Sequence, residues 1–201
     1  NNDRVRKNIN TDSFNPVLSH SSIQGNIDWL YSLYQKLISF DLALYASSDI
    51  RNNAGVDHEF NFFPWDNPWE ADYSKAAAND GFSFSKASIS LNGKDHRVKL
   101  GYFQPSGPGV LGVNWSFQPG TYLGAEIVSR FNKFELALVY ANQYKAPWYK
   151  KTYRLRQNDA STEVSYLYSL GARYNISKSS SVETSLGASK GYLKNAHLKY
   201  K

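Results

Sequence analysis

The sequence predicts an all-β protein, built as an antiparallel up-and-down meander of about nine strands. Two observations predict this fold: apolar and polar residues alternate with a period of two through most of the chain, and short and long connections take turns. Successive side chains of a strand point to opposite faces, so this period indicates strands with one apolar face. The segments that show it are 21–31, 37–46, 82–91, 96–103, 121–131, 134–143, 162–174, 181–190 and 195–201.

One of these stretches also fits a helix. The apolar residues with helical spacing are Ile27, Leu30, Tyr31, Tyr34, Leu37 and Ile38. Helix and strand are easily confused over short windows, and we keep the strand interpretation because the segments that follow alternate.

The connections sort by length. Short turns are expected at 32–36, 92–95, 132–133 and 175–180, and long links at 1–20, 47–81, 104–120 and 144–161. Short turns at one end of a meander and long loops at the other are typical of a transmembrane β-barrel. Such barrels normally have an even number of strands. We therefore expect residues 1–201 to form a single, partial barrel domain.

Composition excludes several classes of protein. Hydrophobic residues make up 41% of the 201 residues and charged ones 20%, so a disordered chain is not expected. The chain has no Cys, which excludes disulfides and thiolate metal sites, and no run of apolar residues long enough for a membrane-spanning helix. The net charge of +6 does not by itself identify a partner. Because the chain lacks Met, Asn1 is not a translation start, and we expect a processed or trimmed product.

Catalytic motifs are missing. The four His residues are scattered, and neither H-E-x-x-H, G-x-S-x-G nor a phosphate-binding glycine loop occurs. The cluster Asp57-His58-Glu59 lies in a polar link, where solvated side chains are the plain interpretation. We expect no enzyme, no metal and no cofactor.

A resemblance adds to this picture. The segment 101–126, with the core Trp115-Ser-Phe-Gln-Pro-Gly-Thr-Tyr122, resembles the chitoporins of the OprD-like family of outer-membrane porins, and 18–21, 144–148 and 169–174 are similar to the same family. The resemblance implies a large barrel of about 16 to 18 strands in the bacterial outer membrane. It implies passive, saccharide-facilitated uptake of chito-oligosaccharides through an aromatic-lined pore. Complete members are about twice as long, so the chain looks like a truncated porin.

The expected partners follow from the same resemblance. They are chito-oligosaccharides and outer-membrane lipid or detergent, with a homo-oligomer left open and no nucleic acid. A Trp or Tyr ring offers an apolar face to a sugar ring and a polar tip to its hydroxyl groups. The substrate-binding candidates are Trp115, Phe117, Asn114, Tyr122, Glu126, Arg130, Tyr144 and Trp148. For Trp115, the plainer alternative is an anchor that holds its loop against the wall.

Charged residues at polar strand positions are expected to line the pore. They are Arg97, Lys99, Glu135, Glu163, Arg173 and Glu183, together with Glu126 and Arg130. Charges inside a porin tune its selectivity, and the plainer interpretation is a wetted wall whose charges cancel. The cations predict a weak preference for anions or polar neutral solutes. The alternative function is a soluble all-β carbohydrate-binding module, which would bury its apolar faces rather than expose them.

Overall fold

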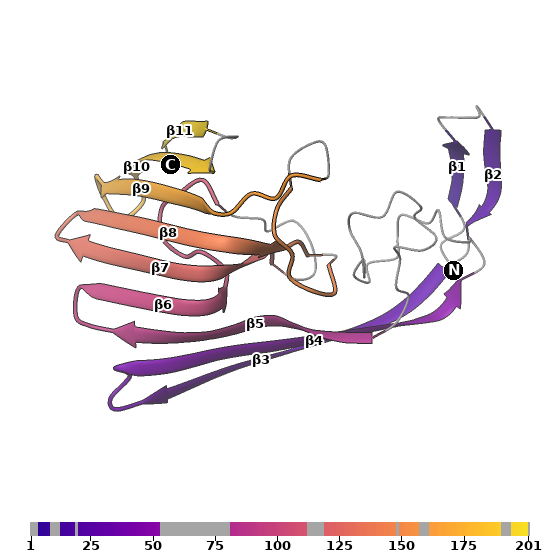
Figure 1. Cartoon of the computed structure of the whole chain (residues 1–201), viewed down its shortest axis with the longest axis horizontal. Helices are drawn as coiled ribbons and strands as arrows, with labels where there is room; N and C mark the ends of the chain where they lie inside the picture. The colour runs from indigo at the N-terminus through magenta and orange to yellow at the C-terminus, as the bar shows by residue number, and fades with distance from the viewer. Residues whose placement is uncertain are drawn as a thin grey trace. The chain divides into compact units, whose positions relative to one another are not determined.

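The structure, a computed structural model, describes residues 4–8, 13–18, 20–52, 81–111, 119–147, 149–156, 161–189 and 194–200. Nine strands form one sheet in chain order, which confirms the predicted meander (Figure 1). They are β3 (His20–Leu33), β4 (Ile38–Asn52), β5 (Gly81–Asn92), β6 (His96–Phe103), β7 (Thr121–Phe131), β8 (Phe134–Lys145), β9 (Leu167–Asn175), β10 (Ser181–Ser189) and β11 (Lys194–Tyr200). Within the described part of the chain, no helix is long and apolar enough to cross a membrane.

The chain divides into two compact units. The first comprises 1–27, 44–83 and 148–151, and the second 28–43, 84–147 and 152–201. The first contains an antiparallel hairpin of β1 (Arg4–Asn8) and β2 (Ser13–Leu18), which the alternation did not predict in the link 1–20. The second contains the features described below. That 1–201 forms a single barrel domain stays a prediction.

Strand bounds follow the predicted segments closely, with two exceptions. β4 continues to Asn52, whereas the alternation predicted its end at residue 46. β9 begins at Leu167 rather than at residue 162. Before it, Glu163 forms an isolated bridge with Arg156, and the Val164 amide donates to the Leu155 carbonyl at 2.8 Å. This local pairing buries Val164, which is only 5% exposed, so the predicted strand start is wrong. The stretch that also fitted a helix is a strand, β3, as far as Leu33.

The short turns lie beside one another at one end of the sheet. The Arg130 amide donates to the Asp95 carbonyl at 2.7 Å, and the Asn175 amide donates to the Lys133 carbonyl at 2.9 Å. The Asn92 side chain reaches the Lys36 carbonyl at 3.0 Å. Each of these bonds links a turn to a neighbouring strand or turn, so the end of the sheet forms a continuous rim.

Gly124 allows two strands to approach closely. The pairing of β7 with β8 shifts register between Leu123 and Gly124, which marks a bulge. A Cβ atom on Gly124 would lie 2.0 Å from the Tyr140 carbonyl oxygen. Only glycine fits this backbone contact.

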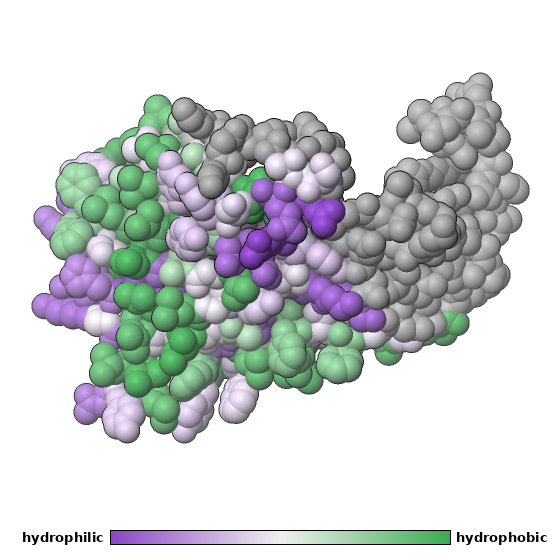
Figure 2. Space-filling view, in the orientation of Figure 1, coloured by the Kyte–Doolittle hydropathy of each residue, from purple (hydrophilic) through white to green (hydrophobic). Residues whose placement is uncertain are grey.

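The two faces of the sheet have burial opposite to that of a soluble protein. Large apolar side chains are exposed, among them Ile127, Leu136, Leu138, Leu170 and Leu186. Polar side chains are buried on the opposite face, among them Ser85, Glu126, Glu135, Ser169, Glu183 and Ser185. Hydrophobic residues form a band across the strands (Figure 2). This arrangement is expected of a sheet with one face toward lipid and one toward a polar lumen.

Aromatic rings flank the apolar band. Near the short turns, the rings of Phe134 and Tyr174 lie 4.8 Å apart. Further along the same strand, Tyr140 stacks on Tyr166 with 6.0 Å between the ring centroids. Leu136 and Leu138 are exposed between these two pairs. Aromatic girdles at both membrane interfaces give such an order.

Candidate functional site: a charged inner face crossed by a strap

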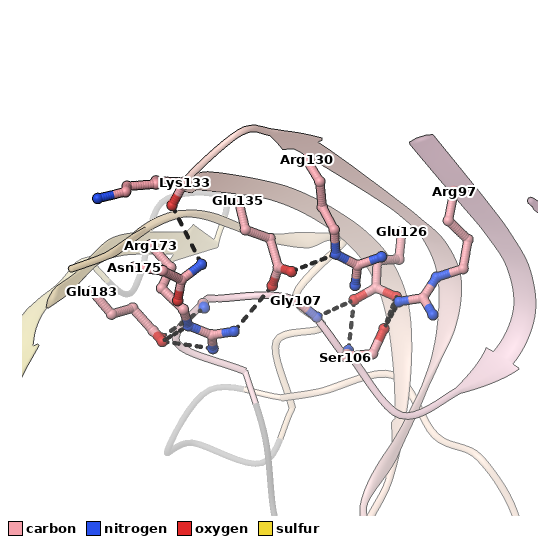
Figure 3. A network of polar contacts seen from close by, with 11 residues as sticks. Arg97, Ser106, Gly107, Glu126, Arg130, Lys133, Glu135, Arg173, Asn175 and Glu183 are labelled. Atoms are coloured by element: carbon pink, nitrogen blue, oxygen red, sulfur yellow. Dashed lines mark hydrogen bonds and ion pairs between the residues drawn. The ribbon is translucent and has the colours of Figure 1, made fainter. Parts of the chain in front are cut away.

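A row of alternating charges crosses the polar face near the short turns. Strand pairing places Arg130 opposite Glu135, Glu135 opposite Arg173, Arg173 opposite Glu183, and Glu183 opposite Lys199. Side chains of directly opposed residues share one face of the sheet. The salt bridges measure 2.7 Å from Arg130 to Glu135, 3.0 Å from Arg173 to Glu135 and 2.8 Å from Arg173 to Glu183 (Figure 3). We call these five residues the charge ladder.

The cations of the ladder are more exposed than its carboxylates. The Arg130 side chain is 56% exposed and its partner Glu135 is 11% exposed. The Arg173 side chain is 29% exposed and Glu183 is 10% exposed. The carboxylates therefore lie against the wall, and the guanidinium groups present their outer edges to the space in front of it.

A second polar group lies on the other side of the sheet's centre. Lys86 of β5 forms salt bridges with Asp28 of β3 at 2.8 Å and with Asp41 of β4 at 3.2 Å. Lys99 of β6 lies opposite Glu126 of β7. Opposite charges on adjacent or next-but-one strands again compensate one another, which agrees with a wetted wall of nearly balanced charge.

A chain segment after β6 crosses this polar face. Residues Ser106–Val110, which we call the strap, donate their backbone amides to side chains of the wall. Ser106 and Gly107 donate to Glu126 at 2.7 and 3.1 Å, Gly109 donates to Glu183 at 3.3 Å, and Val110 donates to the Ser169 hydroxyl at 2.9 Å. The wall residues come from β7, β10 and β9, so the strap spans these strands.

Glu126 is the most enclosed charged residue in the described part of the chain. It is 0% exposed, and its carboxylate also accepts a bond from the Ser106 hydroxyl at 2.6 Å (Figure 3). Arg97 lies 3.8 Å from the same carboxylate and contacts the Ser106 hydroxyl. We expected Glu126 to contact sugar or line the pore. The structure corrects this, because the strap covers its whole side chain.

The rings of Tyr122 and Tyr144 are in contact, as expected of two residues of one site, but Tyr122 is buried. Their rings lie 5.0 Å apart. Tyr122 packs with Ala141 and Leu167 in a small apolar cluster that also contacts Leu111 and Leu155. Burial leaves Tyr122 little surface for a solute, so its assignment as a sugar-stacking residue is corrected to a packing role. Tyr144 is half-buried and pairs by backbone bonds with Tyr153.

The remaining candidates fall into two groups. Trp115, Phe117, Asn114 and Trp148 lie outside the described residues, and their role in sugar binding stays a prediction. Arg130 is exposed on the inner face, Lys99 is half-buried near the Phe103 ring, and Glu163 lies apart from the ladder, in an exposed pair with Arg154 at 3.1 Å. In the ranges that the structure describes, no group of three His, Asp or Glu side chains could hold a metal ion.

Sequence reasoning missed the residues that seat the strap. Ser106, Gly107, Ser169 and Gly171 lie in segments that carry the family resemblance, but none of them was a site candidate, because small residues offer no side-chain chemistry that marks a site. The run Ser106-Gly107-Pro108-Gly109 was one available clue, since glycine allows a backbone to approach another backbone closely.

The architecture is that of an outer-membrane porin, with an apolar outer face and a charged inner face crossed by a loop. Solved porins share the fold. OccAB1 of Acinetobacter baumannii matches with a TM-score of 0.72 and 12% identity over 98% of this chain and 44% of that protein. OpdK of Pseudomonas aeruginosa, solved with vanillate, matches with a TM-score of 0.73 and 13% identity over 92% of this chain and 47% of that one. A BenF-like porin of Pseudomonas fluorescens Pf-5 matches with a TM-score of 0.72 and 13% identity, over 90% of this chain and 45% of that protein.

The sequence is also similar to one characterised protein in particular. The chitoporin of Escherichia coli strain K12 is 30% identical over 199 residues, which cover 95% of this chain and 42% of that protein. The chain thus spans less than half the length of this relative. No family model matches. The comparisons confirm the resemblance to chitoporins and OprD-like porins, and these relatives are outer-membrane porins, channel proteins rather than enzymes. The soluble-module alternative does not fit this fold.

Proposed function

We propose that the protein is an outer-membrane porin that takes up chito-oligosaccharides by passive, saccharide-facilitated diffusion. The observation that carries this proposal is the similarity to chitoporin along 95% of the chain. The solute would pass along the charged inner face of the sheet, on the side that water fills. The apolar outer face is the surface that outer-membrane lipid would cover.

The charge ladder suits a polar solute without net charge. Its cations and anions alternate strand by strand, so the field in front of the wall is weak compared with that of a one-sign surface. The exposed edges of Arg130 and Arg173 keep N–H groups that can donate to hydroxyl and carbonyl oxygens. An N-acetylated sugar offers both kinds of acceptor along its whole length.

Aromatic stacking would supply the rest of the affinity. In the sequence, Trp115 lies in the long link that follows β6, and Trp148 lies in the long link that follows β8. We place sugar stacking on them and on Tyr144, rather than on the buried Tyr122. Assembly as a homo-oligomer belongs to this proposal as well.

Ion-current blockade in a planar bilayer tests the function. The protein should conduct ions, and chitohexaose should interrupt the current in short, concentration-dependent events. Cellohexaose, which has the same β-1,4 linkage but lacks the N-acetyl groups, is the matched control and should block less often. Conductance that both sugars block equally would contradict the proposed chitin specificity, while the proposed porin function would stand. Absence of any conductance would remove both.

A further inference from the structure

We infer that the strap Ser106–Val110 is a fixed part of the pore wall, not a moving gate, and that Glu126 is the residue that positions it. The placement of the strap is independent of the proposed function. Only the conductance measurement below rests on the proposal that the protein is a porin.

Four consecutive contacts hold the strap. Its amides at Ser106, Gly107, Gly109 and Val110 all donate to the wall, which leaves few of its polar groups to solvent on that side. Three of the four bonds end on carboxylates, and hydrogen bonds to ionised acceptors are stronger than neutral ones. Glu126 alone accepts three bonds from the strap, two from amides and one from the Ser106 hydroxyl.

Small residues on three adjacent strands make room for the strap. A Cβ atom on Gly107 would lie 2.4 Å from the Ala137 side chain of β8. One on Gly171 of β9 would lie 2.3 Å from the Pro108 carbonyl oxygen, and one on Gly187 of β10 would lie 2.3 Å from the Val110 side chain. Strap and wall therefore touch without a gap that a side chain or a water layer would need.

The position of the strap against the wall determines which surface a solute meets in the pore. At the level of the strap, solute meets the far side of residues 106–110 and not the β7–β10 wall behind them. The opening is then set by main chain that is bonded on its wall side. A gate would need all four amides and the buried Glu126 carboxylate to find new partners each time it opened.

Engineered disulfides test the placement, because the protein has no native Cys. A Cβ atom on Gly109 would lie 3.7 Å from the Ser169 Cβ, and one on Gly187 would lie 3.6 Å from the Val110 Cβ. Both separations suit a disulfide, whose Cβ atoms are about 3.8 Å apart. We expect the pairs Gly109→Cys with Ser169→Cys, and Val110→Cys with Gly187→Cys, to cross-link rapidly and completely in outer membranes.

The matched control is Gly109→Cys with Gly25→Cys, because nothing lies within 4 Å of a Cβ built on Gly25. This pair should stay reduced. Locking either strap pair should leave single-channel conductance and current noise unchanged. Failure of both strap pairs to cross-link would overturn the placement. Complete cross-linking that closes the channel or quiets a noisy one would show a moving gate. If the reduced protein conducts no ions, the cross-linking result still decides the placement.

Variants of Glu126 test the positioning role. Glu126→Ala removes both acceptor oxygens and with them all three hydrogen bonds, so the Val110→Cys/Gly187→Cys pair should cross-link several-fold more slowly and the channel should become noisier. Glu126→Gln keeps one acceptor oxygen and should lie between Glu126→Ala and wild type. Glu135→Ala removes a wall carboxylate that bonds Arg130 and Arg173, and it should leave the cross-linking rate unchanged. Equal rates in the Glu126 variants and wild type would overturn the assignment.

Discussion

Arg173 donates two hydrogen bonds to one carboxylate oxygen of Glu183, from Nε at 3.1 Å and from Nη2 at 2.8 Å. The third nitrogen, Nη1, donates to Glu135 at 3.0 Å on the opposite neighbouring strand. One guanidinium therefore joins β8, β9 and β10 on the inner face. Its removal would leave two largely covered carboxylates on either side of an uncharged gap.

Arg173→Gln is expected to destabilise the barrel. Glu135 would keep its bond from Arg130 and Glu183 its bond from the Gly109 amide, but both carboxylates would lose their bonds from Arg173. Hydrogen bonds to charged groups are worth about 1.5–3 kcal/mol, so the free energy of unfolding in detergent should fall by that amount. Denaturant titration, followed by tryptophan fluorescence, measures the loss. Arg154→Gln is the control, because Arg154 and Glu163 form an exposed pair whose removal should cost about 0–1 kcal/mol. Equal losses in the two variants would contradict the bridging role of Arg173.

The outward face gives a prediction about depth in the membrane. Leu138 and Phe134 lie on the same face of β8, both exposed, with Phe134 next to the short turn. Arg on the lipid face costs about 2–4 kcal/mol at the midplane and about 0–1 kcal/mol near an interface. Leu138→Arg should therefore lower the yield of folded protein in outer membranes far more than Phe134→Arg. Heat-modifiable mobility on gels separates folded from unfolded protein.

Ala137 cannot serve as the inward control for this experiment. It lies on the other face of β8 but under the strap, where Gly107 packs against it. Arg at this position would displace the strap, so damage there would not report on lipid. Similar yields for Leu138→Arg and Phe134→Arg would contradict the assigned outer face.

Connection length predicts sidedness. Outer-membrane barrels have short periplasmic turns and longer extracellular loops. Single Cys probes at Asn67 and Asn158 in the long links should react with an impermeant thiol reagent on intact cells. Probes at Lys133 and Lys178, in two of the short turns, should react only after the outer membrane is opened. Labelling of Lys133 but not of Asn158 on intact cells would reverse the topology.

The sequence was sufficient for the strands because lipid imposes a simple rule on them. A strand between lipid and lumen must alternate apolar and polar side chains. The apolar residues Leu136, Leu138 and Tyr140 therefore predict the lipid-facing side of β8, and all three are exposed there. The rule stops at the end of the strands that carries the long links. Val164 continues the alternation, yet it leaves the sheet to pair with Leu155, since past this end both faces can meet loops rather than lipid.

The inner face was less predictable, because its residues contact a loop of the same chain and not a uniform solvent. Glu126 has the pattern of a lumen-facing charge, and nothing in its own strand indicates that Ser106 and Gly107 cover it. The contact joins residues about 20 positions apart through backbone amides. Backbone donors carry no sequence signature. The charge ladder, in contrast, follows from strand register once the short turns are known.

Trp115 carries the last prediction. It lies in sequence in the long link between the strap and β7. An indole there would present its face to a passing sugar, and aromatic contacts of this kind are worth about 0.5–1.5 kcal/mol beyond the area they bury. Trp115→Ala should therefore weaken chitohexaose binding by roughly tenfold, which corresponds to about 1.4 kcal/mol. Small-ion conductance should stay the same or rise, because a bulky group leaves the opening.

The control for Trp115→Ala is the same change on the outer face. Trp29 is exposed on β3, with its ring 6.1 Å from that of Tyr31. Trp29→Ala should lower assembly yield and leave sugar binding unchanged. The measurement is the frequency and duration of current blockade by chitohexaose in a planar bilayer. If Trp115→Ala blocks as often and as long as wild type, the indole anchors its loop and does not bind sugar. The stacking surface would then have to come from Trp148 and Tyr144.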